Sequence, residues 1–331
     1  MPGRSLFVAI ALTAILLFVA NVLVGRAARN SVPRQTMRTI DAAPPVIDLL
    51  GMGSSTVAAG FDPVSIEGTF QLAGHPVVAV NGALGATGAI EHLLLVRRAL
   101  QHHIVQQMVY GFADQAMADN TPLMNSDLIG NRALLYYQEP QIAVRYASFN
   151  WADLISFQTD RCCALLRERG TIWAKVEKIR RAMGAYGIPP QATNRFGRAR
   201  DFDLLEASSP EAFVERCNHV MQTGQMLSPP LRELFREARA SGVKVTVVEM
   251  PIHPSHVKAF YELPVWSEYR SATQRAIERI GDSYIDASHW IPEENEFQDH
   301  IHLNPSGAAR FSHKLAEQLL APAFTTKTGN H

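Results

Sequence analysis

The chain has 331 residues, of which 47% are hydrophobic and 19% are charged, and its formal net charge is zero. A chain of this length and composition is typical of one large globular domain, or of one domain with a substantial insertion. The zero net charge excludes a broad electrostatic attraction to nucleic acid or to anionic lipid, so we expect no nucleic-acid partner. The sequence has no zinc-type spacing of Cys and His, and we expect neither a metal nor a cofactor.

The chain has three cysteines, at positions Cys162, Cys163 and Cys217. An odd number that includes an adjacent pair is not typical of a disulfide framework. One bridge between Cys217 and a member of the pair is compatible with the sequence, but we predict three buried free thiols.

Residues Leu6 to Val24 form an apolar run of about 19 residues, interrupted only by Thr13 and Asn21, which is long enough to cross a bilayer as a helix. A cleaved secretory signal usually has a shorter apolar region and a small-residue cleavage site. We therefore predict an uncleaved transmembrane anchor over residues 1–25, followed by a polar tether over residues 26–44. A cleaved signal is the alternative.

The stretch from Pro45 to Leu50 predicts a short and mostly apolar strand, which the glycine-rich segment Gly51–Thr56 ends. Glycines allow a sharp turn of the backbone and a close approach of a ligand. A serine at the carboxyl end of a buried strand lies where open α/β sheets bind their ligands. Considered alone, a plain turn from strand to loop explains this segment equally well.

A second strand is predicted at Val77–Val80, followed by a glycine-rich turn over residues 81–88. Residues 90–100 have apolar side chains at helical spacing, and residues 104–109 predict a third strand. A strand, a helix and a strand in this order indicate a parallel sheet with right-handed crossovers.

Residues 113–226 are predicted to form a helical insertion, or a cap over the sheet. Residues 128–183 have apolar side chains at helical spacings, whereas residues 191–209 are polar and contain several arginines, so we expect an exposed loop there. Trp151 and Trp173 could contact a substrate, although packing is the commoner role of such side chains.

The sheet pattern resumes at Ser228, which together with Pro229 is typical of a helix start. Gly242 is typical of the position just after a helix end. Residues 243–248 then predict a strongly apolar strand. His253 lies just beyond it and is either a surface histidine or a pocket residue.

A helix over residues 271–280 and a short strand over residues 284–286 follow. The last helix is predicted to start at Asn304 and Pro305, a favourable pair for that position. We assign the globular domain to residues 45–322, with a tail over residues 323–331.

Three short motifs stand out: Gly53–Ser55 and Asn81–Gly85, each after a predicted strand, and an Asp-x-x-His-Leu-Asn-x-x-Gly run over Asp299–Gly307, in the predicted loop before the last helix. Through them the chain resembles the SGNH (GDSL-like) hydrolase and acyltransferase family over roughly residues 45–320, and the last motif is the most specific. The resemblance implies an α/β fold with a flavodoxin-like three-layer parallel sheet, here with a helical insertion and an N-terminal transmembrane helix.

The resemblance implies that Ser55 is the nucleophile, His302 the general base and then acid, and Asp299 the residue that orients the histidine. Serine is a weak nucleophile until a base takes its proton, and the pKa of histidine lies near neutrality. Asp299 and His302 are three residues apart, so local geometry can bring the carboxylate to the imidazole. His300 lies in the same predicted loop at the wrong spacing. The alternative is that Asp299 and His302 are ordinary polar loop residues near the start of a helix.

The resemblance also implies hydrogen-bond donors for the oxyanion of a tetrahedral intermediate. The Ser55 N–H is one of them, and Gly85 is predicted to supply the second, with Gly82 as its competitor. The family takes a third donor from the asparagine of a Gly-x-Asn-Asp motif, but here the matching run Gly111–Asp114 has Ala113 at that position. Since loss of one donor costs other serine hydrolases about 10²–10³ in rate, we expect a substitute donor, slow turnover or acyl transfer.

The function implied is a serine-dependent esterase or O-acyltransferase that acts on acyl esters of an extracytoplasmic polysaccharide or cell-envelope glycan, through an acyl-Ser55 intermediate. The arginines after the apolar run favour the cytoplasm for the following chain, but the short N-terminus and the resemblance favour export. We therefore expect a single-pass membrane protein with an extracytoplasmic catalytic domain and a membrane-bound acyl-donor protein as partner. The alternative is a catalytically inactive carbohydrate-binding or assembly protein on the same fold, which only Ala113 supports.

Overall fold

The computed structural model describes residues 2–27, 32–124, 133–169, 172–173, 176, 179–180 and 209–325. The chain forms two compact units, one of Met1–Gln35 with Thr121–Pro190 and the other of Thr36–Asn120 with Gln191–His331. The arginine-bearing loop predicted over residues 191–209 lies outside the described residues except for Ser209, and so do residues 326–331 of the predicted tail.

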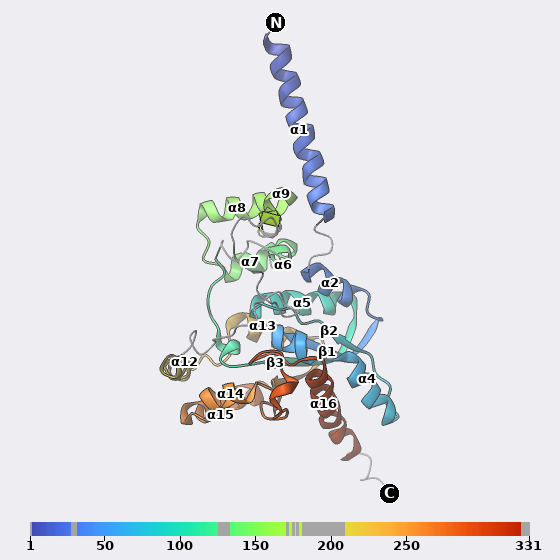
Figure 1. Cartoon of the computed structure of the whole chain (residues 1–331), viewed down its shortest axis with the longest axis vertical. Coiled ribbons are helices and arrows are strands. Elements are labelled where there is room, and N and C mark those ends of the chain that lie inside the picture. Colours follow the sequence, from blue (N-terminus) through green and yellow to red (C-terminus); the bar gives the residue numbers. More distant parts are fainter. Residues whose placement is uncertain are drawn as a thin grey trace. The chain divides into compact units, whose positions relative to one another are not determined.

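The second unit is built on a five-stranded sheet in which every pair of neighbouring strands is parallel (Figure 1). The strands, in their order across the sheet, are β2 (Ala79–Asn81), β1 (Val46–Gly53), β3 (Ile104–Phe112), β4 (Lys244–Glu249) and β5 (Ser283–Asp286). This 2-1-3-4-5 order is that of flavodoxin-like folds. The predicted parallel α/β sheet is therefore confirmed.

Helices cover both faces of this sheet. Tyr110 of β3 packs against Phe235, with ring centroids 5.3 Å apart, whereas the adjacent Val109 belongs to a core cluster with Phe311. Successive strand residues point to opposite faces, so Phe235 and Phe311 lie in different layers. The helices of the Phe235 layer are α5 (Ala89–His102) and α13 (Pro229–Ala240), and those of the Phe311 layer are α3 (Ser55–Gly60), α4 (Pro63–Leu72) and α16 (Pro305–Thr325).

The helix starts and ends of this unit follow local sequence signals. Asp62 accepts a hydrogen bond from Ser65 N and caps α4, whose first residue is a proline. Ser228 and Asn304 precede the prolines that begin α13 and α16, as the sequence predicts. Gly242 follows α13 with a φ of 78°, a left-handed conformation that favours glycine.

Two further helices belong to this unit. Helix α12 (Pro210–Thr223) begins directly after the predicted loop and inside the predicted helical insertion, and Ser209 caps it by accepting from Ala212 N. This Ser-Pro pair is the same start signal that predicts α13. Helix α15 (Pro264–Arg279) begins before the predicted residue 271. Short helical turns complete the unit at α14 (Pro254–His256), Val257–Tyr261, Ala116–Ala118 and Glu294–Glu296.

Helix α2 (Val32–Asp41) occupies most of the predicted polar tether. The tether prediction is wrong there because Met37 and Ile40, one helical turn apart, are buried at 5% and 0% exposure. Two apolar residues at this spacing form a small packing face. The arginines and other polar residues around them make the segment polar in composition, so composition alone does not indicate this packing face.

The described part of the first unit is mainly helical. It includes α1 (Pro2–Ala27), α6 (Ala133–Gln138), α7 (Pro140–Tyr146), α8 (Trp151–Cys162) and α9 (Ala164–Arg167). Asn21, one of the two polar interruptions in the apolar run, accepts a hydrogen bond of 3.0 Å from Leu165 N. The side chain of Asn21 therefore satisfies a backbone donor in the first turn of α9. Trp151 and Trp173 are 82% and 66% exposed in this unit, so neither packs in its core.

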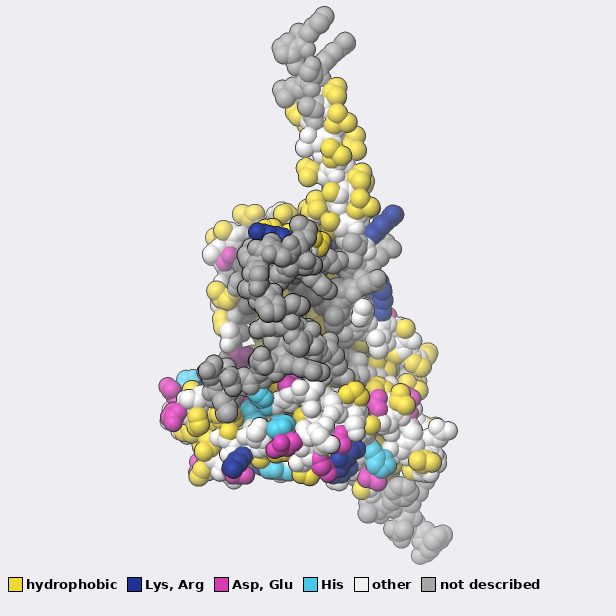
Figure 2. Space-filling model, viewed as in Figure 1, with side chains coloured by type: hydrophobic (Ala, Val, Ile, Leu, Met, Phe, Trp, Pro, Cys, Tyr) yellow, Lys and Arg dark blue, Asp and Glu magenta, His cyan; other side chains and the backbone are white. Residues whose placement is uncertain are grey.

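Helix α1 contains the predicted anchor, and Figure 2 shows apolar side chains along it. Phe7, Leu16 and Phe18 are each more than 65% exposed. Within the described part of the chain, however, no helix combines the length and the apolarity that crossing a bilayer requires. The predicted transmembrane helix over residues 1–25 is therefore not supported.

All three cysteines are free thiols, as predicted. Their predicted burial is wrong for two of them, because Cys162 is exposed and Cys163 is only half-buried. Cys217 is buried, and burial raises the pKa of its thiol despite a hydrogen bond from Gln115.

Candidate active site

The candidate site lies at the carboxyl ends of β1 and β3, where the strand order reverses. Ser55 is the first residue of α3 and follows β1 after a single residue, Ser54. Gly53 has a φ of 149°, and a Cβ there would overlap Gly111 O and the side chain of Val57. Glycine at this position lets the chain turn from the strand into the helix while α3 packs closely on β3.

Ser55, His302 and Asp299 form one continuous chain of hydrogen bonds. His302 Nε2 is 2.8 Å from Ser55 Oγ, and His302 Nδ1 is 2.8 Å from both carboxylate oxygens of Asp299. The side chains of His302 and Asp299 are 0% and 1% exposed, and Ser55 is 9% exposed. The structure thus brings together the three residues to which the sequence assigns catalytic roles, in the order that those roles require.

Asp299 is fixed by its own loop. Its Oδ1 accepts hydrogen bonds from Ile301 N at 3.0 Å and from His302 N at 2.9 Å, in addition to the imidazole. Burial alone would raise the pKa of Asp299, but the hydrogen bonds and the charge of His302, with the two backbone N–H groups, leave that pKa below its ordinary value. The carboxyl is therefore ionised at neutral pH, so it can hold the Nδ1 proton of the imidazole.

The loop that carries Asp299 and His302 is a short hairpin-like turn. Gln298 N donates to His302 O at 2.9 Å, and Phe297 forms an antiparallel bridge with Leu303. A Cβ on Gly307, at the start of α16, would overlap Glu296 O, so glycine lets the helix start lie directly on the loop. The loop is thus held from within and by the helix that follows it.

Further hydrogen bonds join this loop, and the helix that follows it, to neighbouring segments. His253 N, beyond β4, donates to His300 O at 3.1 Å, so His300 contributes its carbonyl here and is not part of the Ser55 chain. In α16, Ser312 Oγ donates to Gly60 O at 3.0 Å and accepts from Asp62 N at 2.8 Å. Helix α16, which begins just after His302, therefore also clamps the end of the helix that Ser55 begins.

Among the described hydrogen bonds, none joins His253 to Ser55, His302 or Asp299. Its Nδ1 accepts a hydrogen bond from Ser255 N at 3.1 Å and caps the short helix α14. Of the two interpretations of His253 given by the sequence, the capping contact favours the structural one.

The loop after β2 carries Gly82 and Gly85, the two residues that compete as the predicted second oxyanion donor. Gly82 N donates to Gly51 O at 2.9 Å, Ala83 N donates to the side chain of Asn81, and Leu84 N donates to Gly53 O at 3.3 Å. These bonds use the N–H of Gly82, the competing candidate, and tie the loop to the strand that leads into Ser55. Within the described residues, no hydrogen bond uses the Gly85 N–H.

A second aspartate–histidine pair lies at the same edge of the sheet and was not predicted. His256 Nε2 is 3.0 Å from Asp114 Oδ1, and Asp114 N donates to the hydroxyl of Tyr261 at 3.0 Å. Asp114 has a φ of 50°, an uncommon conformation for a residue other than glycine. The pair thus braces the turn that follows Ala113, where the expected asparagine is missing. The one sequence signal for it is that both residues follow adjacent predicted strands.

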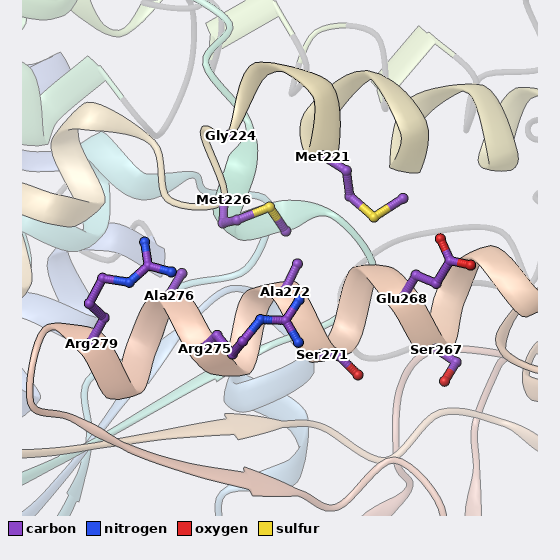
Figure 3. A pocket seen from close by; sticks show the side chains of 10 residues that line it. All are labelled: Met221, Gly224, Met226, Ser267, Glu268, Ser271, Ala272, Arg275, Ala276 and Arg279. Atoms are coloured by element: carbon purple, nitrogen blue, oxygen red, sulfur yellow. The ribbon is translucent and has the colours of Figure 1, made fainter.

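A groove of about 590 Å³ lies between α12 and α15, lined by apolar side chains and by exposed arginines. Figure 3 shows Met221 and Met226 on one wall and Arg275 and Arg279 on α15. Ser55, His302 and Asp299 are not among its lining residues. The groove is therefore separate from the candidate active site.

Comparison with known proteins adds no evidence about the activity of this site. No protein-family model and no curated protein matches the chain. Among solved structures, a lipase/acylhydrolase from Enterococcus faecalis is 11% identical, with a TM-score of 0.39 over 83% of this chain and 97% of that one. A GDSL-like lipase from Bacteroides thetaiotaomicron is 8% identical, with a TM-score of 0.38 over 88% of this chain and 98% of that one. Likeness at this level carries no argument about activity, which rests on the site itself.

Proposed function

We propose that this chain is a serine-dependent esterase or O-acyltransferase that works through an acyl-Ser55 intermediate. The observation that carries the proposal is the buried chain from Asp299 through His302 to Ser55, with a distance of 2.8 Å at each step. A hydroxyl, an imidazole and an ionised carboxylate in this order are the groups that acyl transfer needs.

In the first step, Ser55 Oγ attacks the carbonyl carbon of the ester while His302 Nε2 takes its proton. Asp299 holds the Nδ1 proton and stabilises the imidazolium that forms. The tetrahedral oxyanion is bound by the N–H groups of Ser55 and Gly85. When the intermediate collapses, the ester C–O bond breaks, and His302 gives its proton to the leaving alcohol oxygen.

In the second step, an acceptor hydroxyl gives its proton to His302 and attacks the acyl-Ser55 carbonyl. The bond between Ser55 Oγ and the acyl carbon then breaks, and His302 returns the proton to Ser55 Oγ. The acceptor is water in hydrolysis and a sugar hydroxyl in transfer. Because alanine has no side-chain donor, Ala113 cannot replace the asparagine side chain that serves as the third donor in the family. The proposed oxyanion site therefore has two donors, both peptide N–H groups. We propose that transfer to a glycan is favoured, since loss of one donor slows other serine hydrolases by about 10²–10³.

Labelling with a fluorophosphonate probe tests the proposal directly. We expect the full chain to be labelled and Ser55→Ala to be unlabelled, with loss of hydrolysis of p-nitrophenyl acetate. Ser54→Ala is the matched control: it removes a hydroxyl one residue away, and its side chain makes no capping hydrogen bond to α3. A Ser55→Ala protein that keeps full activity on acyl esters would refute the proposal. An unlabelled wild-type chain would favour the inactive carbohydrate-binding or assembly protein.

The substrate class, the partner and the location remain part of the proposal. We infer an extracytoplasmic acyl ester of a polysaccharide or envelope glycan as substrate, and a membrane-bound acyl-donor protein as partner. Incubation with an acyl donor and a glycan acceptor, followed by mass spectrometry of the glycan, separates transfer from hydrolysis. Acyl transfer to the glycan supports the inference, whereas release of free acid alone in the presence of acceptor contradicts it.

A further inference from the structure

A buried chain of hydrogen bonds leads from the centre of the sheet to the turn that carries Gly85. The hydroxyl of Tyr110, in β3, is 2.9 Å from Nδ1 of His92, in α5. The other nitrogen of His92, Nε2, is 3.0 Å from the hydroxyl of Thr87, which also donates to Leu84 O. Tyr110 and His92 are only 3% and 4% exposed, so the bond between them is shielded from water, whereas Thr87 is half-buried.

The direction of the hydrogen bonds follows from the number of protons available. Thr87 has one hydroxyl proton and donates it to Leu84 O, so its oxygen must accept from His92 Nε2–H. Burial raises the pKa of Tyr110 above its ordinary value, so the phenol keeps its proton and donates it to His92 Nδ1. The donors therefore point one way, from Tyr110 to His92, then to Thr87 and finally to Leu84 O.

The chain ends on the peptide unit that contains the predicted oxyanion donor. Leu84 O and Gly85 N belong to the same planar peptide group. A hydrogen bond accepted by the carbonyl fixes the plane of that group, and it also strengthens the N–H as a donor, since linked hydrogen bonds polarise one another. Ala86, the next residue, has a φ of 59°, so this turn is in a conformation that its surroundings must hold in place.

We propose that Tyr110, His92 and Thr87 are positioning residues for the reaction: they orient and polarise the Leu84–Gly85 peptide so that the Gly85 N–H binds the oxyanion. The inference rests on the proposed function, because it assigns a role within the same acyl-transfer site. None of the three side chains contacts Ser55 or His302 in the described hydrogen bonds. They act through the peptide group alone.

Thr87→Val is the most direct test, because it removes the hydroxyl and keeps the branched shape. We expect kcat on p-nitrophenyl acetate to fall by about 10- to 100-fold, less than the 10²–10³ seen when a donor is deleted outright, and KM to change by less than about twofold. Thr87→Ser keeps the hydroxyl and should restore kcat to within about threefold. Tyr110→Phe removes the first donor only, so we expect a smaller loss than for Thr87→Val.

The chain offers a matched control in Thr69. Its hydroxyl donates to Ser65 O at 2.8 Å and lies 2.8 Å from His313 Nδ1. Like the hydroxyl of Thr87, it therefore contacts one backbone carbonyl and one histidine ring nitrogen, but it lies on α4. Thr69→Val should keep wild-type kcat, whatever it does to the melting temperature. A purely structural role for Thr87 would give Thr87→Val the same behaviour as Thr69→Val.

Active-site counting separates the two proposals. The endpoint of fluorophosphonate labelling gives the fraction of competent Ser55, and kcat is expressed per labelled site. If the wild-type chain is not labelled, the proposed function fails, and this inference fails with it. If the wild-type chain is labelled but Thr87→Val matches its kcat per site, the inference alone is overturned.

Discussion

Two aspartate–histidine pairs lie beyond the carboxyl ends of the same sheet, and they differ in what the histidine meets next. His302 touches both oxygens of an aspartate that is 1% exposed, and its second nitrogen is bonded to Ser55. His256 touches one oxygen of Asp114, whose side chain is 35% exposed. The ring of His256 packs against the aromatic rings of Phe260 and Tyr261.

The contrast teaches that a carboxylate beside an imidazole does not by itself indicate catalysis. At Asp114 the pair braces a turn, because aromatic rings surround the imidazole and no nucleophile is bonded to it among the described contacts. At Asp299 the same two groups are bonded in series to a serine hydroxyl, which is the arrangement that the proposed proton transfer requires. The third residue, and the burial of the carboxylate, separate the two cases.

The largest effect is expected from His302→Gln. Glutamine fills much of the space of the imidazole but cannot act as a base, so activity on p-nitrophenyl acetate should fall by about 10⁴-fold or more. Steady-state rates, normalised to the folded fraction from circular dichroism, measure it. Activity within tenfold of wild type would show that another base serves Ser55.

Asp299→Asn should come next, with a loss of about 10⁴ in kcat. The amide oxygen can keep the two backbone hydrogen bonds that Oδ1 accepts from Ile301 N and His302 N. The amide nitrogen would then donate to His302 Nδ1, which moves the ring proton to Nε2 and prevents that atom from accepting the serine proton. A small loss in kcat would mean that the orientation of the imidazole does not depend on Asp299.

The same variant has a predicted effect on stability in acid. Because the pKa of Asp299 is lowered in the folded state, its carboxylate contributes stability above its unfolded pKa, and this contribution is lost as the pH falls through the folded pKa. Asp299→Asn has no such contribution to lose. Urea unfolding at a series of pH values from 7 down to 3 should therefore show the stability gap between wild type and Asp299→Asn shrinking as the pH falls. A gap that widens in acid contradicts the lowered pKa.

The smallest effect is expected from His256→Gln, the same substitution in the second pair. We expect kcat per labelled site to stay within about threefold of wild type, with a loss of about 1 kcal/mol in the free energy of unfolding from the weakened brace. Rates and urea unfolding on one preparation measure both. A loss of kcat close to that of His302→Gln would end the distinction between the two pairs.

The catalytic candidates were accessible from the sequence through its resemblance to the SGNH family, whose motifs are short and local. Asp299 and His302 are three residues apart, and Ser55 follows a strand that its apolar run already predicts. The helix starts at Pro229 and Pro305 were predictable because each proline follows a residue type typical of helix starts. Asn304 caps α16 by accepting from Gly307 N, whereas Ser228 makes no side-chain capping bond to α13. The catalytic roles of the three residues remain predictions that the experiments above test.

Other features could not be predicted because they depend on contacts between distant residues. His256 and Asp114 are 142 positions apart, and the sequence relates them only in that each follows one of two adjacent predicted strands. Asp48, a charge within an apolar strand, accepts a hydrogen bond of 2.7 Å from Val78 N at the edge of the sheet, a partner that only the strand pairing supplies. Helix α2 was missed for a related reason, because its packing face consists of only two buried residues.

The clamp that Ser312 forms between α16 and the Gly60–Asp62 segment has a consequence for synthesis of the chain. All five strands and Ser55 leave the ribosome before α16 does, so the nascent sheet carries a serine whose base loop is not yet held in place. Under the proposed function, Ser55 gains its general base only when this last helix docks and sets His302 against it. The order of translation would then delay the proposed acyl chemistry until the sheet domain is otherwise complete.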